Sequence, residues 1–80
     1  MRLPRDVSGG HLGRALSKLG YGLARQKGSH LRYATQQGGT HHVTIPNHSP
    51  IKTGMLHGIL KDVASHHGLS VEELVWQLEL

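Results

Sequence analysis

The chain has 80 residues and no cysteine, so it is long enough for one domain with a modest core and excludes disulfides and thiol chemistry. Nine Lys and Arg against five Asp and Glu give a net charge of +4, which points to a polyanionic partner such as RNA, DNA or an acidic protein. Neither a secretory signal nor a membrane span is expected, because no long apolar run is present, and the lack of cysteine fits a cytoplasmic location. We therefore expect a single domain over residues 1–80.

The first predicted element is an amphipathic helix over residues 9–19. Ser8 can cap its N-terminus, and Gly20 stands where a left-handed residue commonly ends a helix. Three glycines inside the segment weaken its intrinsic helix propensity. Apolar residues nevertheless recur along it at helical spacing, namely Leu12, Ala15, Leu16 and Leu19.

Three short strands are predicted next, over residues 21–26, 30–35 and 41–45. Polar and apolar residues alternate in the second and third of them, as in strands buried on one side. Turns that contain glycine separate the strands, so neighbours should pair in antiparallel fashion. Pro46 ends the third strand because proline cannot donate to a strand ladder.

Two helices are predicted after the strands. The first ends at Gly68, and its apolar positions at helical spacing are Met55, Leu56, Ile59, Leu60 and Val63. Ser70 and Glu73 match a capping box, in which the serine hydroxyl and the glutamate each satisfy a free backbone N–H. The last helix then carries an apolar stripe of Leu74, Val75 and Leu78. Trp76 is expected to anchor this helix by packing.

This order of elements predicts an α+β fold with the helices on one face of a three-stranded antiparallel sheet. The predicted core consists of Leu12, Leu16, Leu19, Leu31, Tyr33, Val43, Ile45, Leu56, Ile59, Leu60 and Val63.

Strand alternation also predicts which side chains lie on the open face of the sheet. If Leu31 and Tyr33 point to the helices, their neighbours in the strand point to solvent. The open face then carries His30, Arg32, His42 and Thr44, with Lys27 beside them in a turn. A histidine on such a face is most often a plain surface residue, so this basic patch does not by itself define a function.

Adjacent histidines at residues 41–42 and 66–67 raise the question of a metal site. Neighbouring side chains point to opposite faces of a strand and about 100° apart on a helix, so neither pair can readily chelate one ion. Zinc sites also usually include a cysteine or a carboxylate. We therefore expect no metal and no cofactor.

The segment RQKGSH at residues 25–30 resembles the R-Q-x-G-S-H signature of the HicA (YcfA-like) toxin family. Three later segments resemble the family in the same order: VTIP at residues 43–46 with Asn47 and His48, Gly54 to Lys61, and Gly68 to Leu74. The chain departs from the family at Met55, where threonine is common, and in the stretch 62–67, which is about one turn longer than usual.

The resemblance implies a fold like that of double-stranded-RNA-binding domains, α-β-β-β-α, here followed by an extra short helix. It further implies metal-independent cleavage of mRNA by a toxin whose catalytic histidine corresponds to His30. It also implies neutralisation by a HicB-like antitoxin protein.

RNA can be cut without metal because its own 2′-OH is the nucleophile. The enzyme then needs a base, an acid and cations around the phosphate, and histidine can exchange protons near neutrality. His30 is the candidate base, whereas the acid is open, with His42 favoured from alternation and His48 next. The residues expected to bind RNA are Arg25, Lys27, Gly28, Ser29, Arg32, His42 and His48. Two alternatives are a non-catalytic RNA-binding module and a protein whose basic face docks an acidic partner.

Overall fold

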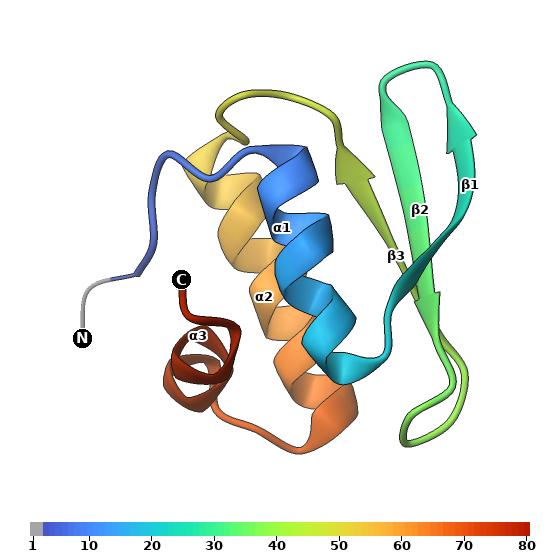
Figure 1. Ribbon diagram of the computed structural model, residues 1–80. Helices are drawn as coiled ribbons and strands as arrows, with labels where there is room; N and C mark the ends of the chain where they lie inside the picture. The colour runs from blue at the N-terminus through green and yellow to red at the C-terminus, as the bar shows by residue number, and fades with distance from the viewer. Residues whose placement is uncertain (1–2) are drawn as a thin grey trace.

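The computed structural model describes residues 3–80 and shows helices packed against one side of a small sheet (Figure 1). The elements are α1 (Gly9–Leu16), a 3₁₀ turn η1 (Ser17–Leu19), β1 (Gly22–Lys27), β2 (His30–Thr35), β3 (His41–Pro46), α2 (Thr53–His67) and α3 (Val71–Leu78). The predicted α+β order is confirmed, and each strand begins and ends within one residue of its expected bounds.

The strands form one antiparallel sheet in the order β1-β2-β3. In Figure 1, α1 and α2 run alongside this sheet, and α3 packs against α2 on the side away from the strands. No helix within residues 3–80 covers the other face of the sheet, and none of them is long and apolar enough to span a membrane. The layering therefore leaves one sheet face open to a partner.

Side chains cap the helices as the sequence predicts. The Ser8 hydroxyl accepts a hydrogen bond from the backbone N–H of His11 at 3.0 Å and begins α1. Ser70 and Glu73 form the complete capping box of α3, with both hydrogen bonds at 3.0 Å. Gly68 ends α2 in the left-handed conformation, with φ 67°.

Two glycines of α1 allow the helix to lie close to the sheet. Gly9 and Gly13 are four residues apart and therefore share one face of the helix. A Cβ atom at Gly13 would run into the ring of Tyr33 in β2, and one at Gly9 would run into the backbone of Pro46 in β3. The low helix propensity of these residues is thus offset by close packing.

The core forms between the sheet and the helices. Most of the predicted core residues are buried, whereas Leu19, Tyr33 and Ile59 are half-buried against it. The irregular segments also contribute, because Val7 and Ile51 are buried and joined by a 2.8 Å backbone hydrogen bond.

The predicted packing of Trp76 is wrong, and one of the apolar positions at helical spacing in α2 is also exposed. Trp76 does not anchor α3, since it is 82% exposed, and Met55 on α2 is 52% exposed. In α3 the buried residues are Leu74 and Leu78, and Trp76 lies midway between them, about 200° around the helix from each. The tryptophan therefore points to solvent for a geometric reason that its hydrophobicity does not reveal.

Candidate nucleic-acid interface

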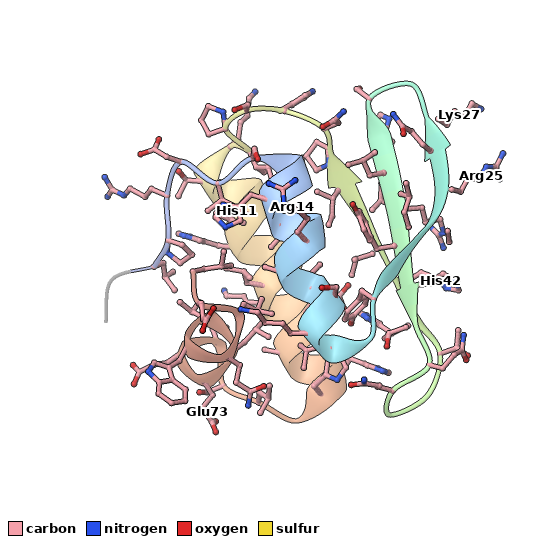
Figure 2. All side chains as sticks on the ribbon, in the orientation of Figure 1. His11, Arg14, Arg25, Lys27, His42 and Glu73 are labelled. Atoms are coloured by element: carbon pink, nitrogen blue, oxygen red, sulfur yellow. The ribbon has the colours of Figure 1, made fainter. Side chains whose placement is uncertain are left out.

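The open face of the sheet brings basic side chains of β1 and β2 together. The register pairs Lys27 with His30 and Arg25 with Arg32, and directly paired residues share a face. Leu31, between His30 and Arg32, is buried on the helix side, so its two neighbours point the other way. Figure 2 shows Arg25 and Lys27 on the side of the sheet away from the helices.

A tight turn holds Lys27 and His30 opposite each other. Only Gly28 and Ser29 separate β1 from β2, and Gly28 has φ 57° whereas Ser29 has no positive φ. This pattern fits a type II′ turn, whose first central residue is typically glycine. The GSH segment therefore fixes the position of the histidine at the start of β2.

A β-bulge in β1 decides which of its side chains join the patch. If the pairing that starts at Lys27 and His30 continued without interruption, Leu23 would lie opposite Ala34, on the open face. The register instead shifts between Leu23 and Arg25, and Leu23 pairs with Tyr33 on the helix side. The bulge keeps the basic residues on the open face and turns the apolar one away from it.

Among residues 3–80, no carboxylate forms an ion pair with this patch. Residues 7–61 contain no Asp or Glu, so all three strands lack acidic side chains. Arg25 and Arg32 nevertheless lie directly opposite each other, and like charges in that position destabilise a sheet. A bound anion would relieve this repulsion, which makes the face suited to phosphate groups.

Five residues line a shallow hollow of about 250 Å³ on this face: Arg25, Lys27, His30, Arg32 and Thr44. Within the hollow, the guanidinium of Arg32 donates a hydrogen bond to the hydroxyl of Thr44, with 3.3 Å between Nη1 and Oγ1. Thr44 is its cross-strand partner on β3 and so fixes the orientation of the arginine. The role of this threonine was not foreseen, although alternation had placed it on the open face.

The other expected RNA-binding residues do not line the hollow. His42 is on the open face but pairs with Ala34. This pair lies two residue pairs along the strands from the Arg32–Thr44 pair. His48 is exposed in the loop after β3, where its carbonyl accepts a 2.9 Å hydrogen bond from Gly9. Gly28 and Ser29 form the turn, and the Ser29 carbonyl accepts a 2.7 Å hydrogen bond from Asn47.

Larger hollows lie on α3, on either side of Trp76. They contain no lysine, arginine or histidine. We place the candidate site at the smaller hollow, because acid–base chemistry on a phosphate needs the cations and the imidazole that line it.

The sequence profile of the family described as HicA toxin of bacterial toxin-antitoxin matches residues 11–64. This chain belongs to the HicA toxin family. No curated protein and no solved structure gives a significant match. The matched segment contains all three strands and every residue that lines the hollow, and it ends inside α2.

This HicA-family chain has a second group of histidines, partly beyond the matched segment. The Tyr21 hydroxyl lies 2.7 Å from Nδ1 of His41 and 3.0 Å from Nε2 of His67. The Nε2 atom of His41 is 3.3 Å from a carboxylate oxygen of Asp62. His66 stacks on His41, with ring centroids 4.4 Å apart, and its Nε2 atom lies within 3.1 Å of two carbonyls in the β2–β3 turn. We call Tyr21, His41, Asp62, His66 and His67 the histidine cluster.

The hydrogen bonds of the histidine cluster limit how many protons it can hold. A tyrosine hydroxyl has one proton, so it donates to one ring nitrogen and accepts from the other. If both rings were charged, His41 and His67 would each present an N–H to the Tyr21 oxygen, and the hydroxyl proton would lose its acceptor. Burial and the neighbouring His66 and His41 lower the pKa of His67, while burial and Asp62 raise the pKa of Tyr21 to about 12.

The histidine cluster joins parts of the fold that are distant in sequence. It ties the C-terminal end of α2 to β3, to the β2–β3 turn and to the segment before β1. Among residues 3–80, no group of three or more His, Asp or Glu side chains is arranged to hold a metal ion. The hydrogen bonds and the ring stacking of the cluster make it a packing and hydrogen-bonding unit.

Proposed function

We propose that this chain is an endoribonuclease toxin that cuts mRNA without a metal ion, with His30 as its catalytic residue. The observation that carries the proposal is the hollow on the open sheet face. There one exposed imidazole stands among three cations that form no ion pair with a carboxylate of residues 3–80. Membership of the HicA toxin family supports the role as a toxin.

In the proposed reaction, the phosphate of one RNA linkage lies among Arg25, Lys27 and Arg32. His30 takes the proton of the neighbouring 2′-OH, and the 2′ oxygen attacks the phosphorus. The cations stabilise the extra negative charge that develops on the phosphate oxygens. The bond to the 5′ oxygen breaks, leaving a 2′,3′-cyclic phosphate and a 5′-hydroxyl.

The proton for the leaving 5′ oxygen has no assigned side-chain donor. His42 and His48 were the candidates, and neither lines the hollow with His30. We therefore infer that solvent supplies this proton. Replacing either histidine by alanine should lower the cleavage rate less than about tenfold, whereas loss of a true general acid would cost about 10²–10⁴-fold.

The test is cleavage of a labelled RNA by the purified chain in the presence of EDTA. We expect cyclic-phosphate products from the parent and no cleavage at a linkage that carries a 2′-deoxy sugar. His30→Ala should lower the cleavage rate by about 10²-fold or more. Cleavage that needed a divalent ion, or that survived in His30→Ala, would contradict the mechanism.

One observation favours a second candidate, a non-catalytic RNA-binding module. The hollow contains a single imidazole, and a binder needs only the cations and the shape of the hollow. The same assay separates the two functions. If the parent binds RNA but does not cut it under any of these conditions, the binding function replaces the enzymatic one.

We further propose that a HicB-like antitoxin silences the toxin by covering the open sheet face. A protein that fits this face would carry carboxylates opposite Arg25, Lys27 and Arg32, and its association would be fast and salt-sensitive. Backbone-amide protection should appear along β1 and β2 in the complex. An antitoxin that protected α3 alone would contradict simple occlusion of His30.

A further inference from the structure

The outward face of α3 carries the most exposed large apolar side chain among the described residues. Trp76 is 82% exposed, and hollows of about 420 Å³ and 650 Å³ adjoin it. Glu72 and Glu73 precede it by four and three residues, so all three share one face of the helix. Tryptophan is enriched at protein interfaces, because it buries a large area and loses little side-chain entropy.

The charges of the chain are separated along its sequence. Residues 62–80 contain four Asp or Glu and no Lys or Arg, whereas residues 7–61 contain seven Lys or Arg and no Asp or Glu. Near α3, Lys18 neutralises Glu79 at 2.7 Å, but Glu72 has no cationic partner among the described residues. The α3 face is therefore acidic, and it repels nucleic acid.

The surface that complements this face is on the chain itself. The open sheet face presents Arg25, Lys27 and Arg32 without any acid. In Figure 2, Glu73 lies at one side of the molecule and Arg25 and Lys27 lie at the opposite side, so one copy cannot bring the two faces together. Two copies can do so head to tail.

We propose that the α3 face, defined by Glu72, Glu73 and Trp76, binds the open sheet face of a second copy of this chain. Carboxylates of α3 would pair with the guanidinium groups of Arg25 and Arg32, and the Trp76 ring would stack on one of them. Such a contact covers His30 of the second copy. Because each copy has a net charge of +4, long-range repulsion opposes the contact and keeps it weak.

Self-association does not depend on the proposed function. Its effect on RNA cleavage, however, rests on the proposed function. If the open face cuts RNA, copies of the toxin at high concentration cover one another's cleavage sites. RNA then competes with the second copy for the same cations. Self-association is measured without RNA, so its failure and the failure of the nuclease proposal are distinguishable.

The first experiment measures the sedimentation of the purified chain between about 20 µM and about 1 mM at about 0.1 M salt, where the Debye length is about 10 Å. We expect the average mass to rise at least about 1.5-fold across this range and to return to that of the monomer at about 1 M salt. Trp76 is the chain's one tryptophan, so its fluorescence should shift to shorter wavelength over the same range. A chain that stays monomeric at the highest concentration overturns the proposal.

Matched variants test which surfaces meet. Trp76→Ala and Arg25→Glu should each remove the concentration dependence. Their controls are Met55→Ala, which removes another exposed apolar side chain, and Lys52→Glu, which reverses a charge away from the sheet. Association that survives in Trp76→Ala or in Arg25→Glu contradicts the proposal, as does its loss in either control.

Mixing two blocked variants gives the sharpest test. Trp76→Ala keeps an intact sheet face, and Arg25→Glu keeps an intact α3 face. Head-to-tail contact therefore predicts that the variants, each monomeric alone, form a one-to-one dimer that does not grow further. Monomers only, or assemblies larger than the dimer, would overturn this arrangement.

Discussion

Two histidine environments in this fold, that of His30 and that of the histidine cluster, are used in opposite ways. His30 begins β2, is exposed among cations, and its ring makes no hydrogen bond to residues 3–80. His41 pairs with Thr35 at the other end of β2 and faces the helices, where it joins His66 and His67 in the histidine cluster. The rings that hold the fold together are engaged by partners, whereas the ring proposed for chemistry is left accessible.

The largest expected effect comes from a pair of variants that removes one histidine from each environment. His30→Ala should lower RNA cleavage about 10²-fold or more while changing the free energy of unfolding by less than about 0.5 kcal/mol. His67→Ala should show the reverse, because it removes a hydrogen bond of the cluster and leaves the hollow intact. Cleavage rates and urea unfolding measure both properties. If His30→Ala unfolded the chain, the distinction between the two environments would be lost.

The next effect concerns the hydroxyl at the centre of the histidine cluster. Tyr21→Phe leaves two ring nitrogens without their partner, so we expect the free energy of unfolding to fall by about 1–3 kcal/mol. Cleavage per folded molecule should stay at the parental rate. Tyr33→Phe is the matched control, since the Tyr33 hydroxyl makes no hydrogen bond to the described residues. Equal stability losses in the two variants would show that the cluster adds nothing beyond packing.

A smaller effect is expected at the cations beside His30. Arg32→Gln removes one phosphate contact, so RNA affinity should weaken for all sequences alike, and the slope of log affinity against log salt should decrease by about 1. Lys52→Gln, away from the sheet, should leave both unchanged. A sequence-dependent loss in Arg32→Gln would instead indicate that this arginine reads bases.

The smallest effect is a pH dependence that belongs to the histidine cluster. The pKa of His67 is lowered in the folded chain, so the unfolded chain binds that proton more tightly. Stability should therefore be complete above about pH 6.5 and should fall as the pH drops through this value. We expect Tm to decrease between about pH 7.5 and about pH 5.5, and less so in His67→Gln. An equal decrease in parent and variant would place the titrating group elsewhere.

The sequence by itself determined the order of the elements and the two sides of the sheet. Alternation assigned Leu31 and Ile45 to the core, where both are buried, and it left His30 and Arg32 on the open face. These features follow from periods of two and 3.6 residues, which act between neighbours along the chain. The capping residues Ser8 and Ser70 were also predicted, because caps depend on contacts only three residues away.

Only the tertiary structure decided the features that depend on distant segments. The bulge that turns Leu23 away from the basic patch depends on pairing between β1 and β2, and the outward position of Trp76 depends on which stripe of α3 meets α2. The histidine cluster joins Tyr21, His41 and His67 from three separate segments, so neither histidine pair in the sequence revealed it. Local patterns fix which way a side chain points from its own element, but its neighbours are set by how the elements pack.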